Sequence, residues 1–474
     1  MRRRLRILVG PAWIAAGALA LWLWIGVGFV NYDTLYALVW GQQMGRGQLP
    51  EYGLPLAPTP HPLAELVGLV VSPLGPTASE HVVVALAYIA LASLAFVVFR
   101  LGQAWFSAPV GLLGAALFIT REPILSYGIR GYVDIPYVVL VLAALLVETR
   151  RRRAGASVLW LLALAGLLRP EAWLLGAGYW TYLAWSHTCQ RAALVRLALI
   201  VVSAPMVWAL SDLLVTGDPM WSLTHTQSTA VALNRVTGIQ NVPVTGAHRL
   251  GEILRPDVLI AAAVGGALSR RLLRDRTRLG LLAGFGAGAA VALLASAGLP
   301  INTRYLMLVA SLLAISAGAG VFGWLYLPLS HRRRRSWQVV GVLLAVVIVA
   351  YIPSQRTRVD RAFQALRRQE QIEADLRSLV GKGTIHRRCG PIGVTNHRAI
   401  PQLALLLRTR PGNIIDTQAR PLTHGTYITL ASPRIAREYM LDPSEAAQAR
   451  STEPRFLRVA SLRDSSWRIY VLCP

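Results

Sequence analysis

The feature that most constrains this chain is a series of long apolar runs separated by short clusters of arginine. A helix needs about 20 predominantly apolar residues to cross the hydrocarbon core of a bilayer. Runs that approach this length cover residues 8–30, 80–100, 105–120, 133–149, 156–169, 171–186, 194–215, 256–269, 279–298, 304–328 and 338–353. The pattern therefore predicts an all-α polytopic membrane bundle with about 11 transmembrane helices.

The composition agrees with a membrane protein. The chain is 54% hydrophobic and 15% charged, with a mean hydropathy of +0.47, which is too apolar for a soluble protein of 474 residues. A formal net charge of +25 would suit a nucleic-acid partner. Because the arginines lie in short clusters between apolar runs, we expect no nucleic acid as a partner and contact with membrane lipids instead.

The arginine clusters also predict how the chain is oriented. With a cytoplasmic N-terminus they all fall on the cytoplasmic side, as positively charged loops do. They lie at residues 2–6, 150–153, 191–196, 270–278 and 332–335. The opening MRRRLR resembles a signal peptide, but no small-residue cleavage site precedes Asp33, so we expect an uncleaved first span. We therefore expect a multi-pass protein of the inner (plasma) membrane.

The last part of the chain has a different character. Residues 354–474 lack long apolar runs, and stretches such as YITLASP and WRIYVLCP are typical of strands. We therefore expect two domains, a transmembrane domain over residues 1–353 and a small extracytoplasmic α/β domain over residues 354–474. Cys389 and Cys473 both fall in this tail, where an oxidising exterior permits a disulfide; two separate buried thiols are the alternative.

Two acids lie at helix ends that this orientation places outside. Asp33 directly follows the first apolar run, and Asp134 begins the fourth. Ionisable groups at membrane depth are costly, so each suggests a function. Either acid could instead cap the helix that follows it. Two acids at outer helix ends nevertheless favour one shared site for acid–base or substrate-orienting chemistry.

Further polar residues interrupt apolar sequence on the same side. Arg169 and Glu171 do so in LLRPEAW, where an ion pair that neutralises itself is the alternative. Asn302, Arg304 and Tyr305 open the tenth span in NTRYLML. An arginine at an outer helix end opposes the positive-inside tendency, which suggests an anionic ligand.

The outer connections hold other candidate side chains, namely Arg121, Glu122, Arg130 and His225. His61 stands alone among prolines in TPHPL, and we expect it to position a substrate rather than to bind a metal. The sequence carries no phosphate-cradling glycine loop, no nucleophile elbow and no Cys/His metal spacing. Nucleotide-driven chemistry in the cytoplasm is therefore not expected.

In their order and shared side, these motifs resemble those of the GT-C superfamily of integral membrane glycosyltransferases. The resemblance is to the branch that contains protein O-mannosyltransferases, aminoarabinose transferases and bacterial relatives, and it covers about residues 8–350. Its carriers are Asp33 with Tyr36, Trp40 and Gly41, then TPHPL, Asp134, LLRPEAW and NTRYLML.

The resemblance implies roles for these residues. Asp33 would be the general base that deprotonates the acceptor, and Asp134 would help to hold acceptor or donor. Substrate binding would fall to Tyr36, His61, Arg121, Arg169, Glu171, Asn302, Arg304 and Tyr305. Where relatives commonly have Lys-Pro-Pro-Leu, this chain has Pro60 to Leu63 with His61, so an arginine would have to meet the donor phosphate. A divalent metal stays an open question, because Asp33-Thr34 replaces the Asp-Glu pair of many relatives.

The implied reaction is the inverting transfer of a hexosyl or pentosyl group from a polyprenyl-phosphate donor. The acceptor would be an extracytoplasmic hydroxyl on a cell-envelope glycan, lipid or protein. The alternatives are a transporter or flippase of lipid-linked sugars and a non-catalytic membrane scaffold. The enzyme requires Asp33, Asp134 and Arg304 around one cavity, whereas a transporter requires a path through the protein.

Overall fold

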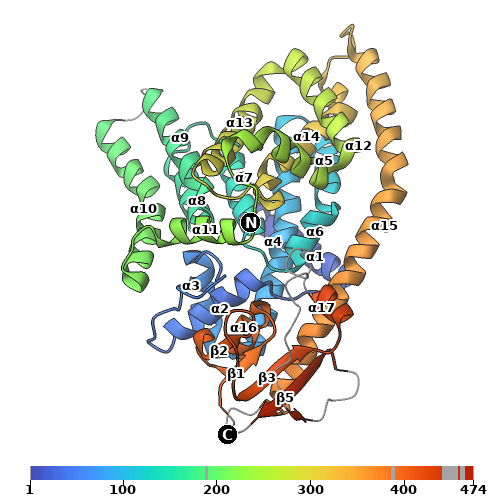
Figure 1. The fold of residues 1–474 in the computed structure, drawn as a ribbon. Helices are drawn as coiled ribbons and strands as arrows, with labels where there is room; N and C mark the ends of the chain where they lie inside the picture. The colour runs from blue at the N-terminus through green and yellow to red at the C-terminus, as the bar shows by residue number, and fades with distance from the viewer. Residues whose placement is uncertain (1, 187–189, 386–389, 440–456, 460–464, 473–474) are drawn as a thin grey trace.

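The protein consists of a bundle of helices with a small β-sheet at one end (Figure 1). The structure is a computed structural model that describes residues 2–186, 190–385, 390–439, 457–459 and 465–472. Cys389 and Cys473 lie outside the described residues, so the disulfide stays a prediction.

Long apolar helices make up most of the bundle. Within the described residues, five helices are long and apolar enough to cross a bilayer. They are α4 (Pro76–Trp105), α10 (Arg191–Thr216), the Thr277–Ser296 part of α13 (Arg274–Ser296), the Thr303–Tyr326 segment and α15 (Arg334–Gly381). The pair α5 (Ala108–Ile119) and α6 (Glu122–Ile129), bent by 69°, would add a sixth. The chain is thus a multi-pass membrane protein.

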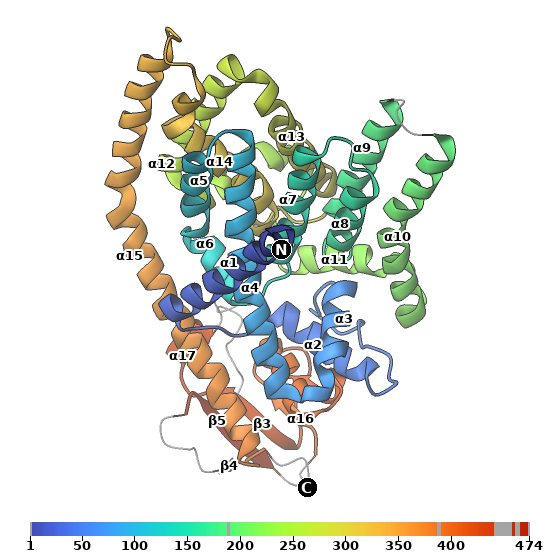
Figure 2. The same ribbon diagram turned by 180° about the vertical axis from the view of Figure 1, so that it is seen from behind.

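The eleven predicted runs each overlap a helix, although their number as spans stays a prediction. The shorter or kinked helices are α1 (Arg2–Ile25), α7 (Asp134–Arg150), α8 (Ala156–Gly166), α9 (Glu171–Trp185) and α12 (Val242–Leu272). Helix α1 packs across α4 (Figure 2). The Thr303–Tyr326 segment comprises η3 (Thr303–Leu306), α14 (Met307–Phe322) and η4 (Gly323–Tyr326).

Small residues let the central helices approach closely. A Cβ atom on Gly102 of α4 would lie 2.5 Å from Cα of Gly111 in α5. One on Gly265 of α12 would lie 2.5 Å from the backbone nitrogen of Gly320 in α14. Close contact of this kind is what drives helix association where lipid and side chains are equally apolar. On the outer helices, by contrast, large apolar side chains such as Leu214 and Val342 point outward, as expected for contact with lipid.

Two short helices, α2 (Tyr32–Met44) and α3 (Pro62–Val71), lie between the bundle and the sheet (Figure 1). The cap of α2 is Asn31, whose Oδ1 accepts the backbone N–H groups of Asp33 and Thr34. Asn31 Nδ2 donates to the carbonyl of Arg130, and Thr34 Oγ1 donates to that of Gly131. Asp33 is therefore not needed as a cap, and the start of α2 is tied to the loop that leads into α7.

The remaining short elements connect these layers. They are η1 (Ser72–Leu74), α11 (Trp221–Ala232), η2 (Ile239–Asn241), η6 (His397–Ala399), α16 (Ile400–Leu407), η7 (Pro411–Asn413) and α17 (Pro433–Tyr439).

The C-terminal part forms one five-stranded mixed sheet in the order β2-β1-β3-β5-β4. Strands β2 (Ile414–Asp416), β1 (Ile392–Val394) and β3 (Gly425–Leu430) are parallel. Strands β5 (Trp467–Leu472) and β4 (Leu457–Val459) complete it in antiparallel fashion. The domain boundary after residue 353 stays a prediction, because α15 continues without a break from Arg334 to Gly381.

The sheet and α2 share one hydrophobic core. Leu35 and Leu38 of α2 belong to the same buried cluster as Leu376 of α15, Val394 of β1 and Leu403 of α16. Helix α2, which carries Asp33, thus packs against the C-terminal part of the chain.

From this packing we predict that Gly41→Ala destabilises the protein. A Cβ atom on Gly41 of α2 would lie 2.3 Å from the carbonyl carbon of Gly68 in α3. Overpacking of this kind costs about 1–3 kcal/mol, so the unfolding midpoint of the purified protein should fall. Gly178→Ala in α9 is the control, since no atom lies within 4 Å of that Cβ position. Equal midpoints for both variants would contradict the predicted contact.

Candidate functional site

A cavity of about 650 Å³ lies where the bundle meets the α2–α3 layer. Its walls come from stretches far apart in the sequence, namely residues 32–33, 56–61, 127–132, 169–171, 226–236, 249, 299–305 and 397–398. The bundle, the outer loops and the C-terminal part of the chain thus all contribute to one hollow.

Asp33 and Arg304 form an ion pair in this cavity. Arg304 Nη1 donates to Asp33 Oδ2 at 2.9 Å, with the two side chains 18% and 22% exposed. Burial raises the pKa of the Asp33 carboxyl, but the attraction of the Arg304 guanidinium outweighs it and lowers that pKa below its ordinary value. Asp33 is therefore an ionised carboxylate at neutral pH.

The pair continues into a buried ionic chain. Arg304 Nη1 also lies 3.8 Å from Asp134 Oδ2, and Asp134 accepts a hydrogen bond from Arg169. Arg169 Nη2 lies 2.5 Å from Glu171 Oε1. The Tyr305 ring covers Arg169, with its centroid 3.9 Å from the guanidinium carbon. Along this run of ionic contacts, carboxylates and guanidinium groups alternate from Asp33 to Glu171.

His61 also lines this cavity. Burial and the nearby Arg169 lower the pKa of its imidazole to about 4, so the ring is neutral at physiological pH. Its Nδ1 is buried without a hydrogen-bond partner among the described residues, and its ring packs edge-on against Trp208 at 5.8 Å. Within the described part of the chain, no group of three or more His, Cys, Asp or Glu side chains is placed to hold a metal ion.

The structure brings together most of the residues that the sequence analysis singled out. Lining the cavity are Asp33, His61, Arg169, Glu171, Asn302, Arg304 and Tyr305. Asp134 does not line the cavity but lies 3.8 Å from Arg304, which does, and it is fully buried. Neither Asp33 nor Asp134 is the N-cap of its helix, because Asn31 and Val133 occupy those positions.

Two predicted residues lie elsewhere. Tyr36 is buried against Trp40 beneath the cavity, and its ring packs edge-on against Tyr32, which does line it. Arg121 is separate from the cavity, because its guanidinium forms a buried ion pair with Asp257 of α12 at 2.8 Å. The Asp257 carboxylate thus already neutralises the positive charge of Arg121, which was the reason for expecting Arg121 to bind a substrate.

Other lining residues were missed or only noted in passing. Arg130 and Arg235 line the cavity, and no carboxylate of the described residues forms an ion pair with either. Arg130 instead contacts the rings of Tyr127 and Tyr132, at 5.3 and 5.0 Å. The reasoning applied to Arg304, that an arginine on the outer side needs an anion, would have found both.

The C-terminal part contributes His397 and Arg398 to the cavity wall. The ring of His397 packs edge-on against Tyr32 at 5.4 Å. No local sequence signal links these residues to Tyr32 and Asp33 at the start of α2, because the contact depends on how the sheet packs against α2.

No protein-family model and no curated protein matches the sequence. Among solved structures, ArnT from Cupriavidus metallidurans bound to undecaprenyl phosphate aligns with a TM-score of 0.55 at 13% identity, over 96% of this chain and 97% of that chain.

Two further structures align over nearly the whole of this chain. Arabinofuranosyltransferase AftD from Mycobacteria aligns with a TM-score of 0.50 at 14% identity, over 100% of this chain and 40% of that chain. Archaeal oligosaccharyltransferase AglB from Archaeoglobus fulgidus, in complex with an inhibitory peptide and a dolichol-phosphate, aligns with a TM-score of 0.51 at 10% identity, over 93% and 72%. The chain therefore has the fold of the GT-C membrane glycosyltransferases, as its sequence motifs predicted.

Proposed function

We propose that this protein is a membrane glycosyltransferase that moves a sugar from a polyprenyl-phosphate donor to an extracytoplasmic hydroxyl. The observation that carries the proposal is that the Asp33 carboxylate and several guanidinium groups face one cavity of about 650 Å³. ArnT and AglB, which share the fold, were solved with bound undecaprenyl phosphate and dolichol-phosphate. A lipid-linked phosphate donor suits a cavity with this surplus of arginine.

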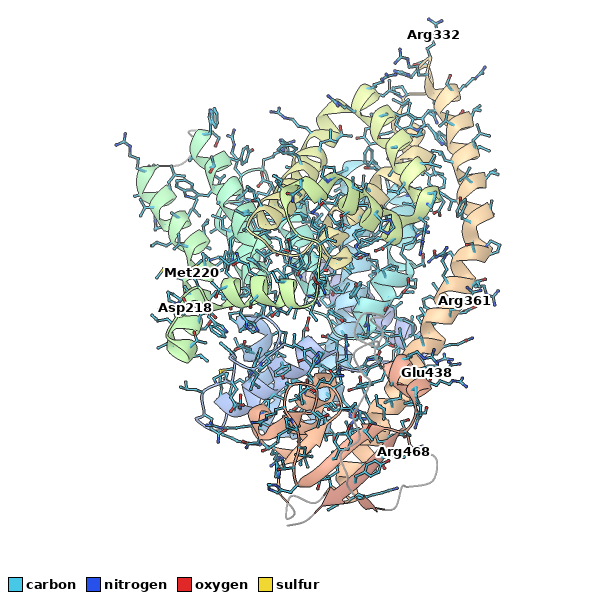
Figure 3. The ribbon with its side chains drawn as sticks, in the orientation of Figure 1. Asp218, Met220, Arg332, Arg361, Glu438 and Arg468 are labelled. Carbon is cyan, nitrogen blue, oxygen red and sulfur yellow. The ribbon has the colours of Figure 1, made fainter. Side chains whose placement is uncertain are left out.

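The arginine clusters support an extracytoplasmic site. Arg332, in the last cluster, lies at the end of the molecule opposite to Arg468 of the sheet (Figure 3). The cavity lies on the sheet side of the bundle, next to α2 and η6. If the clusters mark the cytoplasmic face of the inner membrane, then the cavity and the α/β part from residue 354 onward lie outside.

In the proposed mechanism Asp33 acts as the general base. It takes the proton of the acceptor hydroxyl while that oxygen attacks the anomeric carbon, and the bond from that carbon to the phosphate oxygen breaks. The phosphate leaves with the bonding electrons, and one direct displacement inverts the anomeric centre. Because Arg304 holds the pKa of Asp33 low, a donor phosphate that attracts Arg304 would make Asp33 a stronger base.

The arginines of the cavity differ in whether a carboxylate already neutralises their charge. Arg169 lies between the carboxylates of Asp134 and Glu171, which neutralise its charge. It would therefore attract a phosphate only weakly, and we assign it the role of orienting its neighbours. Arg130 and Arg235 form no ion pair within the described residues. We therefore assign the donor phosphate to Arg130 and Arg235 together with Arg304, rather than to Arg169.

A transporter fits this arrangement less well. The ionic chain sits at one end of the bundle, and α14, which directly follows η3, is packed tightly, with Ala310, Ala314 and Ala317 fully buried. Transporters bind near the midplane between moving halves. The location of the cavity favours chemistry at one face of the membrane.

The first prediction from this mechanism concerns the base. Asp33→Asn should lower sugar transfer by about 10²–10⁴, because the amide cannot accept the proton. The assay is transfer from radiolabelled polyprenyl-phosphate sugars to membrane extract by the purified protein. Asp360→Asn, an exposed acid on α15, is the matched control and should keep full activity. Transfer that survives Asp33→Asn would remove Asp33 from the base role.

The second prediction concerns pH. In the wild type the acid limb of kcat/KM should lie below the ordinary aspartate range near pH 4, because Arg304 lowers the pKa of Asp33. The ion pair stabilises the fold above the pKa of Asp33 in the unfolded chain, and this contribution is lost as the pH falls through the lowered folded pKa.

Arg304→Gln removes that cation and leaves burial to raise the pKa. The acid limb of the remaining activity should therefore move to higher pH, as measured by a pH profile of kcat/KM. An unchanged acid limb would show that Asp33 is not the group whose protonation stops the reaction.

The third prediction concerns the phosphate. Arg235→Gln should raise the KM for the donor by about tenfold or more, as expected for loss of one charge-assisted hydrogen bond. Arg249→Gln is a matched control in the same cavity, because Arg249 is already paired with Glu252 at 2.7 Å, and its effect should be clearly smaller. Equal effects of the two changes would contradict the proposal that the donor phosphate binds the arginines that form no ion pair.

A further inference from the structure

A second cavity, of about 290 Å³, lies where α1 ends, α4 begins and α15 leaves the bundle. Its lining includes Trp22, Gly28, Glu80, Glu370, Glu373 and Arg377. None of these residues lines the larger cavity. The sequence motifs and the proposed glycosyl transfer leave this second cavity without a role.

Its charges do not balance. Three glutamates face one arginine and one histidine, His81, and Arg377 is already paired with Glu80. Glu370 accepts the backbone N–H of Gly28 at 3.1 Å. Glu373 is 6% exposed, and among the described residues its carboxylate has neither a hydrogen bond nor an ion pair. Glu80 Oε1 is likewise buried without a partner in that part of the chain.

A buried carboxylate without a partner is costly, so this arrangement points to a missing cation. Carboxylates only accept hydrogen bonds, and a primary ammonium group offers three N–H donors and a positive charge. A metal ion fits less well, because the described residues hold no set of three acidic, His or Cys side chains placed for one. The chemistry that matches Glu373 and Glu80 is therefore that of a primary amine.

The cavity opens at the edge of the bundle. Trp22, near the end of α1, is 52% exposed, and a Cβ atom on Gly26 would meet no atom within 4 Å. A tryptophan at the end of an apolar helix is typical of the membrane–water boundary. Arg377 Nε is also buried without a partner among the described residues, so a phosphate beside the ammonium group would have a donor.

We propose that this cavity binds a primary ammonium group, supplied by the headgroup of an aminophospholipid or by a soluble amine. Glu373 and Glu80 accept its hydrogen bonds, and Arg377 meets the phosphate where the amine belongs to a lipid. Occupancy restrains the segment around Gly28, which Glu370 already holds and which leads into α2. The proposal does not depend on the glycosyltransferase activity.

The test compares primary with quaternary amines on the full-length purified protein. In one arm the protein is placed in nanodiscs of phosphatidylcholine with or without phosphatidylethanolamine of the same acyl chains. In the other, delipidated protein in detergent is titrated with spermidine or with choline. The readouts are the unfolding midpoint and, for the lipid arm, the retained phosphatidylethanolamine measured by native mass spectrometry.

We expect the unfolding midpoint of the wild type to be a few degrees higher in nanodiscs that contain phosphatidylethanolamine than in nanodiscs of phosphatidylcholine alone. Glu373→Gln keeps the shape of the side chain and removes its charge, so amine affinity should fall about tenfold or more. Asp360→Asn removes one negative charge from the same helix outside the cavity and should behave as the wild type.

The two arms separate the sources of the amine. Stabilisation by phosphatidylethanolamine supports a lipid headgroup, and stabilisation by spermidine without an effect of the lipid supports a soluble amine. Equal effects of primary and quaternary amines would overturn the proposal, as would unchanged affinity in Glu373→Gln. Because the comparison of amines uses the wild type, the proposal stays testable even if Glu373→Gln does not fold.

Discussion

The alternation of charge from Asp33 through Arg304, Asp134 and Arg169 to Glu171 is the interaction on which the candidate site depends. These groups are largely buried, where an isolated charge is expensive and removal of one partner costs about 3–5 kcal/mol. The chain joins the start of α2, the start of α7, the start of α9 and η3, which are distant in sequence. Mutual compensation therefore fixes the relative positions of the segments that form the cavity wall.

Compensation also explains why arginines in one cavity can serve different purposes. A guanidinium group between two carboxylates, such as that of Arg169, is oriented and neutralised, so it contributes geometry. A guanidinium group against aromatic rings, such as that of Arg130 beside Tyr127 and Tyr132, keeps its charge for a ligand. Arg304 is intermediate, because its pairing with Asp33 is partly exposed to the cavity. A ligand phosphate can compete for Arg304 but gains little from Arg169.

The sequence predicted those parts of the structure that follow from the free-energy cost of exposing apolar runs to water or of burying single charged side chains. Apolar runs had to form helices, and charges at helix ends outside the arginine-rich loops had to find partners or ligands. This reasoning found Asp33, Asp134 and Arg304, which the structure brings into contact. It misplaced Arg121, because its partner Asp257 lies 136 positions away, beyond a kink at Arg255 and Pro256 in α12. Pairing at that separation depends on tertiary packing, which no local pattern encodes.

The same limit explains why the sequence did not identify which C-terminal residues reach the cavity. Leu35 and Leu38 of α2 are buried against α15, α16 and β1, while Tyr36 and Trp40 pack on the opposite side with Tyr52. The helix that carries Asp33 is thus buried on both faces, and one of these faces depends on residues after 354. Deleting that part would expose Leu35 and Leu38 as well as remove His397 and Arg398 from the cavity. Loss of activity in such a truncation would therefore not distinguish acceptor recognition from support of α2, whereas substitutions confined to the side chains of His397 and Arg398 leave the shared core intact.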